Sequence, residues 1–384
     1  MTAPAASQRK PLLVVVSGVT GHGGPNASLR AVVPLLGSFE CLLVGPYRSA
    51  ERTQWTEAGV LVEAVPRPRG LVARTRAVAR LSRLVWRLRH RRPVLFANGL
   101  TEAALLAPIA LISRLVLFVW VHNYAVPRIA VALSPLLRRI AAGPLTVAAV
   151  SRMAARVARE VFGEIPVVVV PNPIDRSFWD VRREPIGDRR LRVSYVAGTD
   201  RRYKGFDLLP SIVTASDELG VDWLVVAAEA TQPEAWRALR RSAGALRWSS
   251  VELRGRTDRV QEIYAITDVV LIPSRQESFC RVAAEAMASG AAVVAARLDA
   301  IVEVCGDVAE YFPSEDPVAA TAALRRLIAD PDRVEEMGRR GRARAGRFTR
   351  DAVVARLRDL LGDRAEGASR AAPPRTGGER LGGR

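Results

Sequence analysis

Only three cysteines occur in this 384-residue sequence, and their number and spacing limit where the protein can work. Cys41, Cys280 and Cys305 are odd in number and widely separated, which argues against a disulfide framework and favours a reducing compartment. A secretory signal is not visible either, because residues 1–10 are polar and the apolar stretch from Leu12 to Val16 is too short for a signal core. The sequence therefore predicts a cytoplasmic protein.

Long apolar runs are also few. The longest, Ala103 to Val121, has the length of a membrane span. Arg114 lies inside it, next to Ser113, so a helix followed by a buried strand from Leu115 to Val121 explains the run better. Apolar residues still make up 49% of the chain, enough to build a core and to exclude wholesale disorder. At this length two domains of roughly 150–200 residues are expected.

Acidic residues are scarce in the first half of the chain. Residues 1–180 contain 23 Lys/Arg and 9 Asp/Glu, a net charge of +14 out of +18 for the whole chain. Ten arginines and no acidic residue lie between Arg67 and Arg92. If the segment from Leu71 to Arg89 is helical, its arginines and its apolar residues fall on opposite faces. The arginines are Arg76, Arg80, Arg83 and Arg87, and the apolar residues are Val78, Leu81, Val85 and Leu88.

A basic amphipathic helix of this kind suits the surface of an anionic membrane. An ordinary surface helix, whose apolar side covers the sheet, explains the pattern equally well. Nucleic acid is a weaker alternative, because neither interleaved aromatic residues nor a binding motif accompanies the arginines.

Short β-rich runs alternate with helical patterns along the chain, which predicts an α/β protein with two doubly wound, Rossmann-like domains. The strands expected in the first half are Leu12–Val16, Phe39–Val44, Val60–Val65, Val94–Ala97, Leu115–Val121, Thr146–Val150 and Val167–Val170. Those expected in the second half are Arg192–Ala197, Trp223–Ala227, Val251–Leu253, Val269–Ile272 and Ala292–Ala295. Two such sheets that face each other place the carboxyl ends of their strands at a shared central cleft, where ligands bind.

Composition sets the expected boundaries. A polar, turn-rich segment follows residues 171–175, so we place a first domain at 1–180 and a second at 181–345. After Ala295 we expect only helices, the last of them at 346–361 and returning to the first domain. Residues 362–384 are rich in Gly, Arg and Pro and are predicted to be a disordered tail.

A glycine-rich segment, Ser17 to Gly24, follows the first strand, and Pro25 suits the first turn of the helix after it. Backbone amides at a helix start favour anions. The segment lacks both a Walker lysine and a full G-x-G-x-x-G pattern, so ligand contact and a plain turn remain equal alternatives.

A second loop, Gly198 to Gly205, joins an expected strand to an expected helix and contains three cations, Arg201, Arg202 and Lys204. Lysine supplies a mobile point charge and arginine a fork that can hold two oxygens, so the loop could clamp a diphosphate. The alternative is a solvated basic loop.

Two glutamates, Glu277 and Glu285, follow the expected strand Val269–Ile272. Ionised carboxylates that face a cleft suit the recognition of hydroxyl groups. The free backbone amides of residues 278–281, at the start of the next helix, could hold a phosphate. Alternatively, Glu277 caps a turn and Glu285 is a surface charge.

Taken together, these motifs resemble the family-4 retaining glycosyltransferases (glycosyl transferases group 1), which have the GT-B fold. The similarity runs from about Leu12 to Leu361 and is most specific in the E-x7-E pattern from Glu277 to Glu285. Other matching pieces stand in the same order as in the family: Trp120–Asn123, Pro171–Asp175, Gly198–Gly205, Leu253–Gly255, Tyr264, Asp268–Ser274 and Glu303–Asp307.

The resemblance implies roles for named residues. The residues expected to act on the leaving group or the donor sugar are Lys204, Arg201 or Arg202, Glu277 and His122. The residues expected to bind the donor are Gly23, Gly24, Gly198, Glu277, Ser278, Phe279, Cys280, Arg281 and Glu285. Of these, Glu285 is expected to bind the ribose hydroxyls and Glu277 the sugar hydroxyls.

The resemblance further implies a nucleotide-sugar donor (UDP-, GDP- or ADP-linked), retention of anomeric configuration, and no requirement for a metal or cofactor. The acceptor is expected to be lipid-linked or a cell-surface glycan, which would place the protein at the inner face of the cytoplasmic membrane; a soluble natural product or oligosaccharide is the alternative. A nucleotide-sugar 2-epimerase and an inactive membrane-surface module are rival functions.

The chain departs from the family pattern at three positions. Thr199 replaces the usual arginine, and Ser278 and Cys280 replace two glycines. A Cβ atom at Cys280 is expected to narrow the sugar pocket or to change the backbone there.

Overall fold

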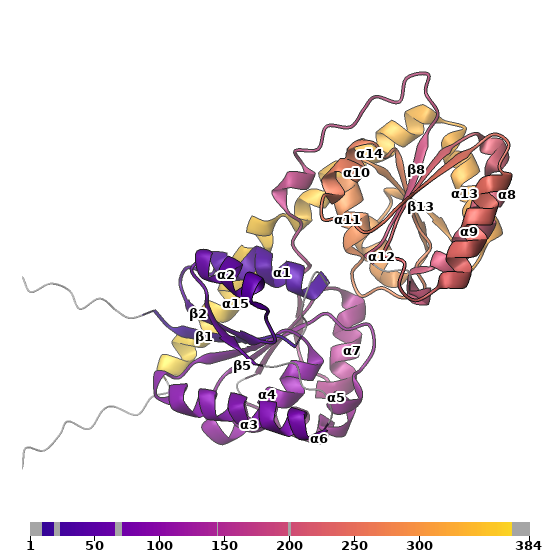
Figure 1. Ribbon diagram of the computed structural model, residues 1–384. Helices are drawn as coiled ribbons and strands as arrows, with labels where there is room; N and C mark the ends of the chain where they lie inside the picture. The colour runs from indigo at the N-terminus through magenta and orange to yellow at the C-terminus, as the bar shows by residue number, and fades with distance from the viewer. Residues whose placement is uncertain (1–9, 19–23, 66–70, 144, 199–200, 371–384) are drawn as a thin grey trace, which may run out of the picture.

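The structure, a computed structural model, describes residues 10–18, 24–65, 71–143, 145–198 and 201–370. They form two α/β domains, each built on one parallel sheet (Figure 1). This arrangement confirms the predicted pair of Rossmann-like domains.

The first sheet has the strand order β3-β2-β1-β4-β5-β6-β7, and all its pairings are parallel. Its strands are β1 (Leu12–Val16), β2 (Glu40–Gly45), β3 (Leu61–Ala64), β4 (Val94–Ala97), β5 (Leu117–Val121), β6 (Leu145–Ala149) and β7 (Val167–Val169). The central strands β1, β4 and β5 are buried along their whole length, which is why their sequences are continuously apolar rather than alternating.

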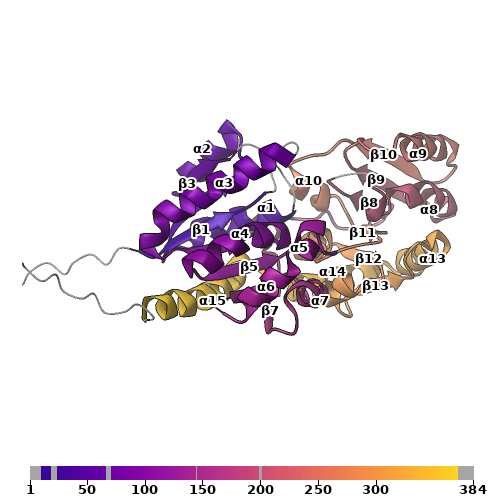
Figure 2. The ribbon, with the colours of Figure 1, turned by 90° about the horizontal axis from the view of Figure 1, so that it is seen from below.

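Helices cover both faces of this sheet. They are α1 (Gly24–Val32), α2 (Ser49–Glu57), α3 (Leu71–Leu88), α4 (Leu100–Ser113), α5 (Arg128–Ala132), α6 (Ser134–Ala141) and α7 (Arg152–Phe162). Helices α3 to α6 pack beside one another on the lower face in Figure 1, and Figure 2 shows the same layer from below.

The second sheet has the order β10-β9-β8-β11-β12-β13. Its strands are β8 (Arg192–Val196), β9 (Asp222–Val226), β10 (Ser250–Arg254), β11 (Val269–Ile272), β12 (Ala292–Ala296) and β13 (Ala309–Phe312). Its helices are α8 (Leu209–Ala215), α9 (Pro233–Ala245), α10 (Val260–Ala265), α11 (Arg281–Ala288), α12 (Asp299–Cys305), α13 (Pro317–Ile328) and α14 (Pro331–Ala345). Helices α8, α9 and α13 pack together on one side of the sheet, and α11, α12 and α14 on the other (Figure 1).

Strand β13 corrects the expectation that the chain is purely helical after Ala295. The strand pairs with β12 at the edge of the sheet. Its four residues include Glu310 and Tyr311 and are only partly buried except for Phe312, so they lack the apolar run by which central strands are recognised.

The last helix, α15 (Arg350–Arg370), follows the second domain in the chain but packs against α1 (Figure 1). Its apolar residues Val353, Val354, Leu357 and Leu361 are buried in the cluster that contains the first-domain core. The chain passes between the domains twice, and an isolated parallel β-bridge between Ile174 and Thr349 joins these two segments just before α15 begins.

The prediction that a disordered tail starts at residue 362 is wrong for residues 362–370, because α15 continues to Arg370. Aspartate, arginine, alanine and glutamate directly follow Gly362, and a helix accepts all four more readily than the glycine. The rest of the predicted tail, 371–384, lies outside the described residues.

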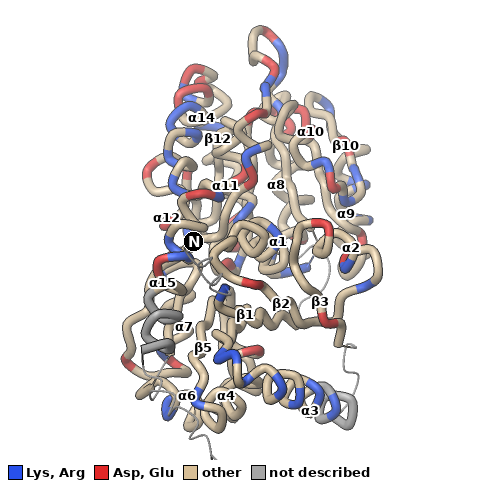
Figure 3. The backbone as a smooth tube through the Cα atoms, turned by 90° about the vertical axis from the view of Figure 1, so that its left-hand side faces the viewer, with Lys and Arg blue, Asp and Glu red and all other residues tan. Residues whose placement is uncertain are grey.

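Helix α3 carries the arginines that the sequence analysis placed on one face, and Figure 3 shows positive and no negative positions along it. Arg76, Arg80, Arg83 and Arg87 are exposed. Leu81 and Val85, on the opposite side, are buried in the first-domain core. The apolar side of α3 therefore covers its own domain. Across the described part of the chain, the helices fall short of the length and apolar character needed to cross a membrane.

Candidate active site

The loop after β8 brings Lys204 against the first glutamate of the E-x7-E pattern. Lys204 ends a short 3-10 helix, Arg202–Lys204, and its Nζ atom lies 2.7 Å from Oε1 of Glu277. Ser274 donates a hydrogen bond of 2.9 Å to the same carboxylate oxygen. Although burial opposes the charged ammonium group, Glu277 raises the pKa of Lys204 above its ordinary value. The ammonium group therefore stays charged in a largely buried position.

Gly205 explains why this loop can approach the second sheet so closely. Its φ is +72°, and a Cβ atom added there would lie 2.0 Å from the carbonyl oxygen of Pro273. Only glycine fits this position. The glycine after Lys204 thus holds the lysine next to the strand that leads to Glu277.

The two arginines of the loop do not join this pair. Arg201 and Arg202 are exposed, and Nε of Arg202 lies 3.9 Å from Oδ2 of Asp207. The loop is fastened instead by Arg275, which forms two hydrogen bonds with Asp207 and donates to the carbonyl of Arg202. Arg275 could not be identified from the sequence, because a single arginine near a glutamate is indistinguishable from a surface charge.

At the other end of the loop, Gly198 forms a bend after β8, and a Cβ atom there would meet nothing within 4 Å. The space around Gly198 would therefore admit a side chain, and no close backbone contact requires glycine at this position. Thr199 lies outside the described residues.

Helix α11 begins directly after the expected donor-binding segment, residues 278–280. Cys280 is its N-cap residue and has φ +74° and ψ +73°, in the left-handed region that favours glycine. The backbone thus keeps a glycine-like conformation with a cysteine in place. Phe279 is buried and packs edge-on against Phe348, with ring centroids 5.3 Å apart. Burial raises the pKa of the Cys280 thiol well above its usual range, so the thiol stays protonated.

One turn into α11, Glu285 is paired with Arg281, whose Nη2 lies 3.2 Å from Oε1 of the carboxylate. The Glu285 side chain is only 13% exposed. Burial raises its pKa, and the positive charge of Arg281 opposes that effect. The interpretation of Glu285 as a plain surface charge is therefore wrong.

The first domain contributes buried polar groups at the carboxyl ends of its strands. His122 follows β5, and neither of its ring nitrogens has a hydrogen-bond partner in the described part of the chain. Burial, followed by the nearby charge of Arg281, lowers the pKa of His122 to about 3, so the imidazole is neutral. Gly24 begins α1, whereas Gly23 lies outside the described residues.

Glu102 is a further buried carboxylate that the sequence analysis missed. It lies in the first turn of α4 and accepts a hydrogen bond of 2.8 Å from the backbone amide of Gly18. Burial raises its pKa and this hydrogen bond opposes the shift. Glu102 anchors the start of the glycine-rich segment to the neighbouring strand–helix unit.

Direct contacts join these two groups of residues across the domains. Ser151, the N-cap residue of α7, donates a hydrogen bond of 2.5 Å to the carbonyl of Ser278. Arg281 donates a hydrogen bond of 2.9 Å to the carbonyl of Pro173. The rings of Tyr124 and Tyr203, one from each domain, have centroids 6.0 Å apart. The expected donor-binding segment is thus in contact with the first domain.

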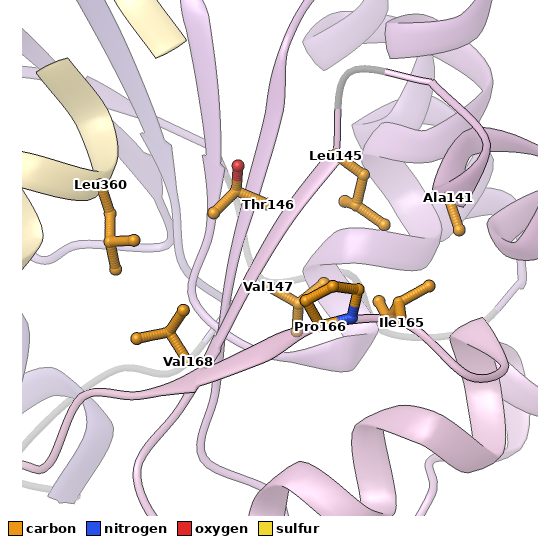
Figure 4. A pocket seen from close by; sticks show the side chains of 8 residues that line it. All are labelled: Ala141, Leu145, Thr146, Val147, Ile165, Pro166, Val168 and Leu360. Atoms are coloured by element: carbon orange, nitrogen blue, oxygen red, sulfur yellow. The ribbon is translucent and has the colours of Figure 1, made fainter. Parts of the chain in front are cut away.

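The described residues contain no group of three or more His, Cys, Asp or Glu side chains that could hold a metal ion. A cavity in the first domain lies elsewhere, at the amino ends of β6 and β7 (Figure 4). Apolar side chains dominate its lining: Ala141, Leu145, Thr146, Val147, Ile165, Pro166, Val168 and Leu360. It has no cation or carboxylate and does not belong to the site.

Comparison with known proteins shows sequence similarity within the second domain and structural similarity over nearly the whole chain. Residues 190–330 match the family described as glycosyl transferases group 1. The D-inositol 3-phosphate glycosyltransferase of Corynebacterium diphtheriae is 36% identical over 110 residues, which cover 28% of this chain and 26% of that protein. The MMP alpha-(1->4)-mannosyltransferase of Mycolicibacterium hassiacum is 31% identical over 182 residues, 46% of this chain and 43% of that protein. The chain thus matches less than half the length of these curated relatives.

Solved structures resemble the chain over nearly its whole length. HepE of Anabaena in complex with UDP and glucose superimposes with a TM-score of 0.76 at 17% identity, covering 92% of this chain and 99% of that one. A glycosyltransferase from Rickettsia africae gives a TM-score of 0.74 at 13% identity, with 94% and 100% covered. The chain therefore has the GT-B fold, and residues 190–330 of its second domain are similar to the glycosyl transferases group 1 family.

Proposed function

We propose that the protein is a retaining glycosyltransferase that moves a sugar from a nucleotide-sugar donor to a hydroxyl group of an acceptor. The observation that carries the proposal is the grouping of Lys204, Glu277 and Glu285 at the start of α11, inside the region that matches glycosyl transferases group 1. These residues combine a fixed cation with two carboxylates, as the binding of a diphosphate and of sugar hydroxyls requires.

The donor is a nucleotide sugar, and UDP-glucose is the first to test because HepE was solved with it. In our proposal Lys204, together with Arg201 or Arg202, neutralises the diphosphate, and the backbone amides of residues 278–281 hold a phosphate oxygen. Glu277 accepts hydrogen bonds from the sugar and Glu285 from the ribose. Both arginines are exposed in the free chain, so they would have to turn inward when the donor binds.

The neutral imidazole of His122 suits a sugar hydroxyl. A neutral histidine offers one donor nitrogen and one acceptor nitrogen, and in the described part of the chain both are without a partner. A buried polar group without a partner is costly, so a ligand hydroxyl that satisfies it gains binding energy.

In the proposed reaction the bond between the anomeric carbon and the diphosphate oxygen breaks, and the acceptor oxygen forms a bond to the same carbon from the same face. Negative charge grows on the departing phosphate, and the fixed cation beside it lowers the barrier directly. The acceptor proton passes to a phosphate oxygen of the leaving group. This route needs no protein nucleophile and no metal ion.

For the acceptor we propose a lipid-linked molecule at the inner face of the cytoplasmic membrane, reached through electrostatic attraction of α3. The support is the exposed row of four arginines on a helix without acidic residues; only Arg80 has an ion-pair partner, Glu63, in the described part of the chain. Because Leu81 and Val85 are buried, the attraction would act without insertion of the helix.

The deciding experiment measures nucleoside diphosphate released from UDP-, GDP- and ADP-sugars by the purified protein, with and without an acceptor extract. A transferase releases nucleotide faster when acceptor is added and makes a glycosylated product. A sugar epimerised in the absence of acceptor, whether or not nucleotide is released, would identify an epimerase instead. Neither release nor epimerisation of any donor would support an inactive binding module.

A further inference from the structure

The guanidinium group of Arg281 contacts both domains. Its Nη2 atom lies 3.2 Å from Oε1 of Glu285 in its own helix. Its Nη1 atom lies 2.9 Å from the carbonyl oxygen of Pro173 and 3.4 Å from Oγ of Ser28, both in the first domain. The side chain is 19% exposed.

The first-domain partners of Arg281 are held in place. The Ser28 hydroxyl lies 2.7 Å from Oδ1 of Asn172 and 3.1 Å from the carbonyl oxygen of Gly24. Gly24 itself is close to the arginine, since a Cβ atom added there would lie 3.4 Å from Cδ of Arg281. The guanidinium group thus fits between the first turn of α1 and the turn that contains Asn172 and Pro173.

Glu285 depends on this arginine for its charge. Burial favours the neutral acid and raises the pKa of Glu285, and the groups that act against burial are Arg281, the hydroxyl of Tyr264 on α10 and the ammonium group of Lys204. Lys204 already forms an ion pair with Glu277. Arg281 is therefore the main counter-ion of Glu285. The ionised carboxylate accepts hydrogen bonds at both oxygens, whereas in the protonated acid one oxygen carries a donor proton.

We infer that Arg281 is a positioning residue that keeps Glu285 ionised for nucleotide binding and ties it to helix α1 of the first domain, so that one guanidinium group couples nucleotide recognition to the contact between the domains. The inference rests on the proposed function, in which Glu285 binds the nucleotide. The side chain of Arg281 does not need to touch the substrate for this role.

The first test follows nucleotide affinity as a function of pH, by calorimetry with whichever of UDP, GDP and ADP the native chain binds most tightly. Without Arg281, the pKa of Glu285 rises further and the carboxylate is protonated at a higher pH. Arg281→Gln should therefore lose affinity as the pH is lowered, beginning at a higher pH than in the native chain. Arg281→Lys, which keeps the charge, should restore most of the native pH profile.

Two controls isolate this effect. Glu285→Gln removes the titrating group, so adding Arg281→Gln to it should produce no further pH dependence. Arg152→Gln removes another arginine at the domain contact, one that lies 3.7 Å from Glu303 and is 77% exposed, and should leave the profile unchanged. If the profiles of native protein and Arg281→Gln coincide, the inference is wrong.

The second test addresses the link to the first domain through a double-mutant cycle. Ser28→Ala should weaken nucleotide affinity at least about twofold in the native background, the lower range for contacting residues, and should have no effect in the Arg281→Gln background. Equal effects in both backgrounds would overturn the coupling. Glu285→Ala distinguishes failure of the proposed function from failure of the inference about Arg281. If Glu285→Ala leaves nucleotide affinity unchanged, or if none of the three nucleotides binds, both fail. If Glu285→Ala weakens binding and Arg281→Gln does not, the inference alone fails.

Discussion

Lys204 and Glu277 form a hydrogen-bonded ion pair, with 2.7 Å between Nζ and Oε1, and come from loops that are 73 residues apart in the sequence. In the free chain this carboxylate neutralises the cation. A diphosphate that enters the site offers Lys204 a second anionic partner. The pair thereby keeps the lysine aimed and charged before the donor arrives, which is the pre-organisation that electrostatic catalysis needs.

Replacing Lys204 with alanine should reduce turnover by about 100-fold or more, the range seen when one fixed donor is removed from a developing negative charge. It should also lower the free energy of unfolding, because Glu277 is left buried without its partner. Turnover is measured as nucleoside diphosphate release and stability by urea unfolding. The double variant Lys204→Ala/Glu277→Gln is the control, since it should recover stability without recovering turnover. Native turnover in Lys204→Ala would contradict the role of the lysine.

The buried His122 should make the protein less stable in mild acid. Its pKa in the folded chain, about 3, lies below the unfolded value of about 6.5, so the unfolded chain binds a proton in that interval and the folded chain does not. The contribution is negligible above about pH 6.5, and below it the free energy of unfolding falls by up to about 1.4 kcal/mol per pH unit. Urea unfolding at several pH values should show a steeper loss for native protein than for His122→Asn. Parallel curves would contradict the lowered pKa.

Activity should survive chelation of divalent metal ions. The proposed stabiliser of the leaving group is Lys204 with an arginine, and the described residues offer no cluster of metal-binding side chains nearby. The measurement compares nucleotide release before and after treatment with EDTA and gel filtration. A complete loss that returns only when Mg²⁺ or Mn²⁺ is added would show that the reaction needs a metal.

Cys280 should restrict the choice of donor sugar. Its left-handed backbone is that of a glycine, so the side chain adds volume to the proposed donor-binding segment without changing the course of the chain. Cys280→Gly should therefore accept a wider range of donors, with larger relative kcat/KM values for the sugars that native protein uses poorly. Cys280→Ala, which keeps Cβ, should lie between the two.

Arg114→Gly provides the matched control for Cys280. Arg114 also has a positive φ, 50°, but is exposed at the end of α4 in the first domain, outside the E-x7-E segment. Removing its side chain changes backbone strain in the same way and should leave the donor preference unaltered. If Cys280→Gly and Arg114→Gly behave alike on the donor panel, Cys280 does not select the sugar.

Binding to anionic vesicles should be purely electrostatic and should therefore weaken as salt is added. A Lys or Arg near such a surface contributes about 1 kcal/mol, so four exposed arginines are enough for reversible association, and added salt should abolish it. Co-sedimentation with phosphatidylglycerol vesicles compares native protein with the variant Arg76/Arg80/Arg83/Arg87→Glu. The control changes the same charge on the second domain and replaces four exposed arginines, Arg237, Arg240, Arg241 and Arg247, with glutamate. Equal binding by both variants would refute a role for α3, and a soluble acceptor would become the better hypothesis.

The central strands could be predicted from the sequence because burial on both faces forces a continuous apolar run. Strands β1, β4 and β11 begin and end at the predicted residues, whereas the edge strand β13 was missed because only one of its four residues is fully buried. Propensity misled at the last helix, where the glycine at 362 is followed by residues that continue the helix. Local sequence thus identifies strands whose residues are all buried. It fails at edge strands and helix ends, where a few residues determine the structure.

The candidate site divides in the same way. The glutamates and Lys204 stood out because their spacing forms a motif, whereas Ser28, Asn172 and Glu102 matter only through contacts with residues far away in the chain. Their identities carry no periodic pattern. Arg201 and Arg202, in the loop from Gly198 to Gly205, were expected to contact the diphosphate but are exposed. The sequence of a loop does not determine where a long side chain points.

Because α15 completes the core of the first domain, that domain is discontinuous in the order of synthesis. Its seven strands emerge from the ribosome first, but the apolar residues Val353, Val354, Leu357 and Leu361 follow only after all of the second domain has been made. Until then the surface that α15 covers next to α1 is exposed to water. The second domain, by contrast, is contiguous and can fold as soon as α14 is available. During synthesis, the second domain should therefore reach its final stability before the first, although the sheet of the first domain is made earlier.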